Sequence, residues 1–85
     1  MNPKKLLARV ASGHLRNVAF RDIQSLVEAF GFRLVRTEGG HHIYSHPANV
    51  EQLNLQSVAG EEEPYQIRQF LRLVERYDLR MEEQS

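Results

Sequence analysis

A short stretch near the middle of the chain organises the rest of the sequence, and it reads Gly39-Gly40-His41-His42-Ile43-Tyr44-Ser45-His46-Pro47. It contains three of the four histidines of this 85-residue chain. Two glycines precede the run and a proline ends it, while Ile43 and Tyr44 favour extended backbone, so the pattern predicts a β-strand. Titratable side chains are concentrated in this one strand, which is where we expect the chemistry.

Side chains alternate between the two faces of a sheet along a strand. One face of the predicted strand carries His41, Ile43 and Ser45, and the other carries His42, Tyr44 and His46. The sequence does not decide which face turns to the core, because either Ile43 or Tyr44 can be the inward residue.

Metal binding is one chemistry that histidines suggest. His42 and His46 share a face, but on a strand they lie roughly 13 Å apart at about 3.3 Å per residue, whereas a Zn–N bond is only about 2 Å long. On a helix the same spacing would chelate well. The chain has no cysteine, and Glu38 is the one carboxylate near the motif. We therefore expect no metal and no other cofactor.

Acid–base catalysis is the other chemistry, because a histidine ring gives or takes a proton near neutral pH. His41 is the best candidate, since Gly39 and Gly40 before it form a flexible turn that leaves room for a substrate. The alternative is that the histidines are half-buried sheet residues with hydrogen-bonded rings. Motif chemistry alone favours this structural role.

Composition limits the classes of function. Eleven basic and eleven acidic residues give a formal net charge of zero, and phosphate binding depends largely on basic surface. Any RNA site must therefore come from local clustering. No apolar run approaches the ~18 residues of a membrane span, and the amino terminus lacks the pattern of a secretory signal. With no cysteine in the chain, we expect a cytoplasmic protein that does not enter a membrane.

Hydrophobic spacing predicts three helices around the histidine strand. The first begins at Asn2-Pro3 and ends at Ser12-Gly13, and it can dock either on the domain or on a partner. The second runs from about Val18 to a stop at Gly31 and is expected to cover the sheet. The third runs from about residue 64 to residue 77, with a buried stripe at helical spacing.

Two further strands are predicted, residues 32–37 before the histidine strand and residues 50–56 after it. The first is joined to the histidine strand by a hairpin at Glu38-Gly39-Gly40. In the last strand Leu53 and Leu55 alternate with Asn54 and Gln56, a pattern typical of a sheet with one wet face. Residues 57–63 are predicted to form a loop, and residues 79–85 a frayed acidic tail.

Three arginines repeat every four residues on the third predicted helix, at Arg68, Arg72 and Arg76. This spacing places them on one side, where they form a basic ridge that can contact phosphate. The alternative is a solvated face that pairs locally with Glu75.

Together with residues 32–37 and Leu53-Asn54-Leu55-Gln56, the histidine stretch resembles the HicA family of bacterial toxins. Those proteins are small ribonucleases, described as mRNA interferases, and each is paired with an antitoxin. The family pattern is a glycine, a small residue and a catalytic histidine, usually followed by a second histidine, an aromatic residue and His-Pro. Residues 39–47 match it, with Gly40 where serine is commoner, and the resemblance extends roughly over residues 20–77.

The resemblance implies an α+β fold like that of double-stranded-RNA-binding domains. Such a fold has a three-stranded antiparallel sheet with helices on one face, to which this chain adds an N-terminal helix. We expect residues 1–85 to form a single HicA-like domain. Residues 1–13 would be the accessory helix, 18–77 the core and 78–85 a tail.

The resemblance also implies the toxin of a type II toxin–antitoxin system, which cleaves single-stranded mRNA without a metal ion and binds a HicB-like antitoxin. It makes His41 the catalytic residue. Candidates for an auxiliary role are His42, Tyr44 and His46, and candidates for phosphate contact are Arg33, Arg36, Arg68, Arg72 and Arg76. A non-catalytic module on the same fold that binds RNA or protein is the alternative function.

The chain departs from the family pattern in its charge. Relatives are usually basic and often carry lysine near the start of the last helix, where this chain has Glu61-Glu62-Glu63-Pro64-Tyr65. This departure predicts weak nonspecific affinity for RNA.

Overall fold

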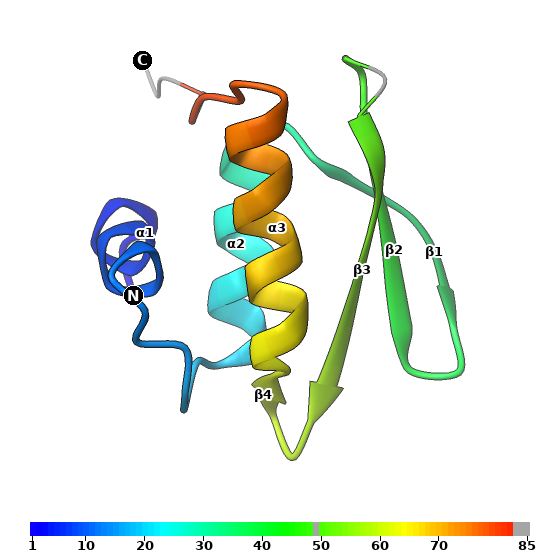
Figure 1. The fold of residues 1–85 in the computed structure, drawn as a ribbon. Coiled ribbons are helices and arrows are strands. Elements are labelled where there is room, and N and C mark those ends of the chain that lie inside the picture. The colour runs from blue at the N-terminus through cyan, green and yellow to red at the C-terminus, as the bar shows by residue number, and fades with distance from the viewer. Residues whose placement is uncertain (49, 83–85) are drawn as a thin grey trace.

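Helices and strands occupy separate layers in the computed structural model, which describes residues 1–48 and 50–82. In chain order the elements are α1 (Pro3–Ala11), α2 (Phe20–Ala29), β1 (Arg33–Glu38), β2 (His41–His46), β3 (Val50–Val58), β4 (Glu61–Glu62) and α3 (Pro64–Arg76). In Figure 1, α3 lies in front of α2 on one side of the sheet, and both helices pack on β3, with α1 beyond them on the side away from the sheet. The predicted α+β class is confirmed.

The three predicted helices are present, with ends that differ from the predicted ones by about two residues. In α1 the side chain of Asn2 accepts a hydrogen bond of 2.8 Å from the backbone N–H of Lys4, and Pro3 occupies the first helical position. This is the cap that the Asn-Pro pair predicts. After α2, Gly31 has a φ of +94°, the left-handed conformation that ends many helices.

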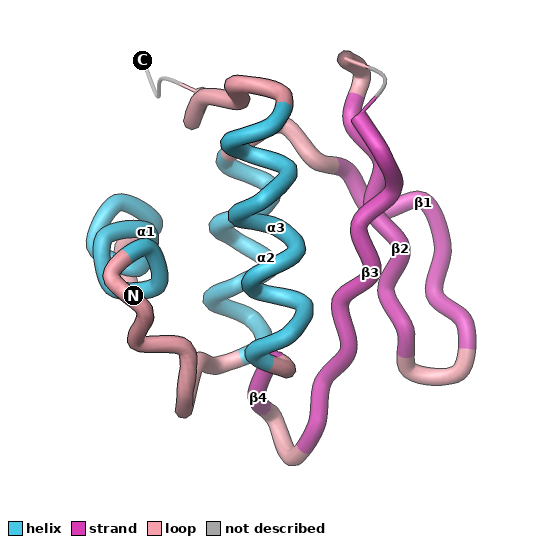
Figure 2. The backbone as a smooth tube through the Cα atoms, in the orientation of Figure 1, coloured by secondary structure: helices cyan, strands magenta, loops and turns pink. Residues whose placement is uncertain are grey.

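The sheet is antiparallel with strand order β1-β2-β3-β4. It has four strands within the described residues, so the predicted three-stranded sheet and the predicted loop at residues 57–63 are both wrong in this detail. β3 continues to Val58, and the chain then turns at Ala59 and Gly60, which both have positive φ. Such a two-residue turn matches the twist of a hairpin, and it brings Glu61 opposite Val58. In Figure 2 this short β4 lies beside the starts of α2 and α3.

The hydrophobic core lies between the sheet and the layer of α2 and α3. From the sheet it takes Tyr44, Leu53 and Leu55, which are fully buried, whereas Asn54 and Gln56 are partly exposed. The predicted wet face of β3 is therefore confirmed. Tyr44, not Ile43, is the inward residue of β2, which settles the side of the sheet on which each histidine lies.

The segment after α3 is packed rather than frayed up to residue 82, so the predicted tail is wrong over this part. Leu79 and Met81 pack against the core, and the backbone N–H of Glu82 donates a 2.6 Å hydrogen bond to the carbonyl of Ala29. Residues 83–85 of the predicted tail lie outside the described residues. In the part of the chain that the structure describes, no helix is long and apolar enough to cross a membrane.

Candidate active site on the histidine strand

His41 is the first residue of β2 and follows the turn formed by Gly39 and Gly40, both of which have positive φ. It lies opposite Glu38 of β1 and Gln56 of β3. Because Tyr44 points to the core, His41 points to the opposite, helix-free side of the sheet, which we call the open face. The ring is partly buried there.

One side chain of β3 holds the ring of His41. The Nδ1 atom of His41 lies 3.0 Å from Nδ2 and 3.2 Å from Oδ1 of Asn54. When Nδ1 carries a proton it donates to Oδ1, and Nε2 is then left with a lone pair that can accept a proton. Nε2 of His41 has no hydrogen-bond partner among the described residues. The arrangement therefore fixes one ring nitrogen and leaves the other able to exchange a proton.

The open face around His41 is polar but nearly neutral. Arg36 of β1 lies on it and donates a 3.0 Å hydrogen bond from Nε to Oε1 of Glu38. Ser45 shares the face with His41 by strand alternation. The positive charge of Arg36 is thus paired with the carboxylate of Glu38.

His42 and Tyr44 lie on the other face, against the helices. The ring of His42 meets Phe20 of α2 edge-on at 4.8 Å. The Tyr44 hydroxyl accepts a 3.1 Å hydrogen bond from Gln24 of α2, and burial raises the pKa of this hydroxyl. The structure does not bring either side chain together with His41, although both were candidates for an auxiliary role.

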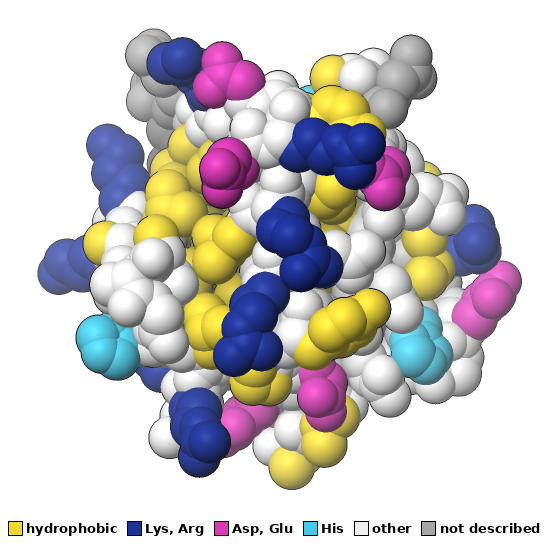
Figure 3. Space-filling model, viewed as in Figure 1, with side chains coloured by type: hydrophobic (Ala, Val, Ile, Leu, Met, Phe, Trp, Pro, Cys, Tyr) yellow, Lys and Arg dark blue, Asp and Glu magenta, His cyan; other side chains and the backbone are white. Residues whose placement is uncertain are grey.

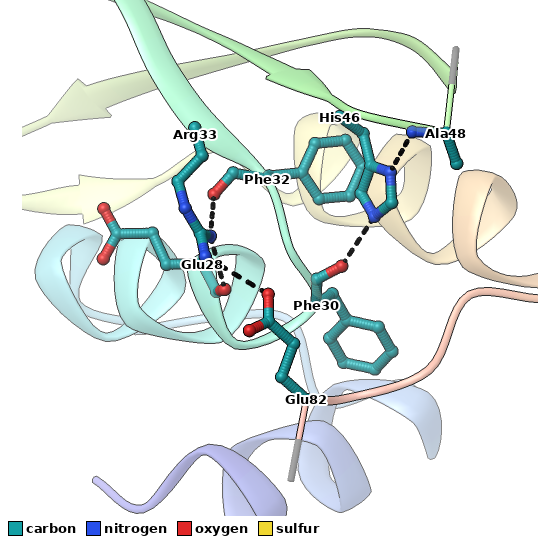
Figure 4. Close-up of polar contacts among 7 residues, drawn as sticks. All are labelled: Glu28, Phe30, Phe32, Arg33, His46, Ala48 and Glu82. Carbon is teal, nitrogen blue, oxygen red and sulfur yellow. Dashed lines mark hydrogen bonds and ion pairs between the residues drawn. The ribbon is translucent and has the colours of Figure 1, made fainter. Parts of the chain in front are cut away.

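His46, the third auxiliary candidate, is also bound to the helix layer (Figure 4). Its Nε2–H donates a 2.8 Å hydrogen bond to the carbonyl of Phe30, and its Nδ1 accepts from the backbone N–H of Ala48 at 3.1 Å. Its ring also packs edge-on against Phe32 at 5.0 Å. A Cβ added at Gly31 would lie 2.9 Å from Nε2, so glycine leaves the space that this contact needs. Both ring nitrogens of His46 have structural partners.

The arginines proposed from the sequence are dispersed. Arg33 donates to the carbonyls of Glu28 and Phe32 and pairs with Glu82 at 3.2 Å, which turns it toward the end of α2 (Figure 4). Arg68, Arg72 and Arg76 lie on α3 in the helix layer and are exposed, and Arg76 pairs with Glu51 at 3.1 Å. Arg33 lies opposite Ser45 in the sheet, but its guanidinium is turned away from His41, so Arg36 is the arginine of β1 that stays beside the open face.

A comparison with known protein families identifies the family of this chain. Residues 20–75 match the model of a family described as HicA toxin of bacterial toxin-antitoxin. The chain belongs to the HicA toxin family. It is therefore a toxin of a toxin–antitoxin system, for which an antitoxin is the implied partner, and its fold is the double-stranded-RNA-binding-domain-like fold of HicA proteins. No curated protein and no solved structure matches the chain significantly.

The HicA match covers α2, the whole sheet and nearly all of α3, so it includes His41 and Asn54. Helix α1 lies outside the matched residues. Within residues 1–48 and 50–82, no three histidine, cysteine or carboxylate side chains come together as a candidate metal site.

Sequence reasoning missed two residues of this HicA chain. Alternation predicts that Asn54 lies on the wet face of its strand, but its contact with His41 depends on the register between β2 and β3, which cannot be read from the sequence. The sequence predicts that Glu62 lies in an acidic loop, yet its side chain is only 3% exposed. Its Oε2 accepts from the backbone N–H of Gln56 at 3.1 Å, and its Oε1 has no hydrogen-bond partner among residues 1–48 and 50–82. Burial raises the pKa of Glu62 to about 8, so it is mostly protonated at neutral pH.

Proposed function

We propose that this HicA chain is an endoribonuclease that cleaves mRNA without a metal ion, with His41 as its general acid or base. The observation that carries the proposal is the His41–Asn54 pair on the open face, at 3.0–3.2 Å. It leaves Nε2 of the histidine free to exchange a proton, and it lies at the position where the family motif has its catalytic histidine.

The reaction that suits a single positioned histidine is transesterification within the RNA. The 2′-hydroxyl attacks the adjacent phosphorus, an O2′–P bond forms, and the P–O5′ bond breaks. The hydroxyl proton passes to a base and the departing 5′ oxygen receives a proton. Because the nucleophile belongs to the substrate, no metal-activated water is needed. His41 performs one of these proton transfers, and Asn54 keeps its ring in place.

The neighbours of His41 limit the other roles. His42, Tyr44 and His46 face the helices, so the second proton transfer does not fall to them in this arrangement. Arg36 is the arginine on the open face, and we assign it to the phosphate, where it would exchange Glu38 for the substrate anion. The antitoxin partner is proposed to be HicB-like.

A non-catalytic RNA-binding module is the second candidate. Catalysis at phosphate depends largely on positive charge that stabilises the phosphorane. The open face is nearly neutral and offers little such charge, which favours the non-catalytic module. In this module Asn54 would stabilise a histidine that only contacts RNA.

The test is incubation of purified, antitoxin-free protein with a defined single-stranded RNA in excess EDTA. We expect cleavage that leaves 2′,3′-cyclic phosphate ends, and a rate lower by about 10²–10⁴-fold in His41→Ala. His14→Ala is the matched control, since His14 is exposed and lies outside the motif, and it should cut at the native rate. Circular dichroism checks that each variant is folded.

Cleavage by His41→Ala at the native rate would refute the assignment of His41. RNA that binds to the native protein but stays intact would instead favour the non-catalytic module.

A further inference from the structure

Most arginines of the described chain already have partners. Arg33, Arg36, Arg76 and Arg80 each pair with a carboxylate, and the guanidinium of Arg9 donates to loop carbonyls. Within the residues that match the HicA model, Arg21, Arg68 and Arg72 have no ion pair among the described side chains. Two of these three, Arg68 and Arg72, lie one turn apart on α3.

An exposed aromatic ring lies on the same side of α3. Tyr65 is 63% exposed, although large aromatic side chains are usually buried for most of their surface. At about 100° per residue, Tyr65, Arg68 and Arg72 fall within about 60° of one another around the helix. We call these three residues the α3 track. Figure 3 shows Lys and Arg side chains along α3, with hydrophobic side chains beside them.

The position of the α3 track connects it with the open face. Helix α3 packs on β3, and β3 is hydrogen-bonded to β2, the strand that carries His41. On its other side β3 pairs with β4 only at Ser57 and Val58. Helix α3 and His41 therefore lie on opposite faces of the sheet, on either side of β3. No other described strand covers the edge of β3 over residues 50–56 (Figure 1).

Resting on the proposed ribonuclease function, we infer that the α3 track binds the single-stranded RNA that flanks the cleavage site. Arg68 and Arg72 contact successive phosphates, and the Tyr65 ring stacks on a base. Single-stranded nucleic acids are held by this combination of cations along the backbone and an exposed aromatic ring. The RNA then crosses the edge of β3 and reaches His41 on the open face, where the protein itself offers little positive charge.

The side chains of the α3 track favour RNA over an acidic protein segment as the ligand. This side of α3 carries Arg68, Arg72 and Arg76 together with the exposed ring of Tyr65. The cations therefore follow one another without the apolar stripe between them that a docked helix would need. The phenol ring offers a flat surface to a nucleobase, and every base has such a surface.

The test measures binding of fluorescein-labelled oligouridylate to the His41→Ala protein by anisotropy, over a range of salt concentrations. We expect Tyr65→Ala to weaken binding by about 5- to 100-fold, and Tyr65→Phe to bind as the parent does, because the ring is what stacks. Arg68→Gln and Arg72→Gln should each lower the slope of log K against log salt by about 0.7. Arg16→Gln is the matched control, because Arg16 is an exposed arginine outside the track. It should change the slope less than either track substitution does.

A second ligand, an abasic ribose-phosphate oligomer of the same length, separates stacking from charge. Tyr65→Ala should not change its binding, and an equal loss for both ligands would overturn the stacking role. Parent-like RNA binding by all three track variants would overturn the inference. Polyglutamate that binds to the track while RNA binding stays independent of it would also overturn it, in favour of a protein site.

The inference and the proposed function fail in different ways. RNA cleavage by the native chain without any dependence on the track refutes the inference alone. RNA binding that depends on the track, without cleavage by the native chain, refutes the ribonuclease and leaves the track as an RNA-binding surface of the non-catalytic module.

Discussion

The two faces of β2 carry neighbouring side chains of one motif but serve different purposes. On the open face, His41 contacts the side chain of Asn54 and leaves Nε2 without a partner in the described structure. On the other face, His46 uses both ring nitrogens to hold the chain around Phe30 and Ala48. A motif rich in histidine therefore need not contain several catalytic histidines, because the alternation of a strand assigns them to opposite sides.

The helix-facing side of the sheet also holds the polar groups that affect folding. Tyr44 is bonded to Gln24, and the buried carboxyl of Glu62 accepts from the backbone of β3. These groups connect the sheet to the helix layer, so their loss should change stability first. Substitutions on the open face should change chemistry first. The predictions below test this division.

The largest effect is expected from Glu62, whose pKa burial raises from 4.5 to about 8. The folded state therefore binds this proton more tightly than the unfolded state. The stabilisation is fully present below pH 4.5 and is lost as the pH rises through about 8. Glu62 should lower the free energy of unfolding by about 1.4 kcal/mol for each pH unit across this range. Urea unfolding at several pH values measures it.

The control for this prediction is a pair of substitutions in one strand. Glu62→Gln should remove the pH-dependent difference and be more stable than the native protein at pH 8, whereas Glu61→Gln, at an exposed position, should follow the native profile. The native protein and Glu62→Gln differ in this one ionisable group, so the difference between their profiles isolates Glu62. Parallel profiles for the native protein and Glu62→Gln would show that Glu62 is ionised in the fold.

The next effect is expected from His46→Ala. The substitution removes two hydrogen bonds and leaves the carbonyl of Phe30 without its donor, which should lower the free energy of unfolding by about 2–3 kcal/mol. His41→Ala is the matched variant and should lower it by less than about 1 kcal/mol. Below its unfolding temperature, His46→Ala should still cleave RNA. A folded His46→Ala protein as inactive as His41→Ala would mean that both faces take part in catalysis.

Much of this division is present in the sequence. Alternation alone separates His41 from His42 and His46, and the alternating leucines of β3 predict that one face is wet. The core side of β2 is not predictable in the same way, because Ile43 and Tyr44 are both suited to burial. Tyr44 is inward because Gln24 of α2 meets its hydroxyl and because Phe20 and Phe32 offer their rings to the flanking histidines.

Other features depend on contacts between residues far apart in the chain. Arg33 reads as an exposed strand arginine, but the carbonyl at the end of α2 and the carboxylate of Glu82 bind it. Glu61 and Glu62 have low strand propensity, and they pair only because the turn at Ala59 and Gly60 brings them against β3. Neither the contacts of Arg33 nor the pairing of β4 with β3 can be predicted from the hydrophobic periodicity of a short segment.

The smallest effect is expected from Asn54, which does not itself transfer a proton. Asn54→Ala removes one hydrogen bond to the His41 ring, so cleavage should slow by about tenfold, equivalent to roughly 1.4 kcal/mol. Gln52→Ala, an exposed position on the same strand, is the control and should cleave at the native rate. If Asn54 only stabilises the sheet, the loss will disappear at a temperature where the variant is fully folded.

A carboxylate at the same position distinguishes positioning from packing. In Asn54→Asp the negative charge beside the His41 ring favours the protonated imidazole. If His41 acts as the base, the acidic limb of the pH profile of cleavage should move to higher pH, whereas a packing defect would lower the rate equally at every pH. An unshifted pH profile would mean that residue 54 does not influence proton transfer by His41. His41 would then act without help from Asn54.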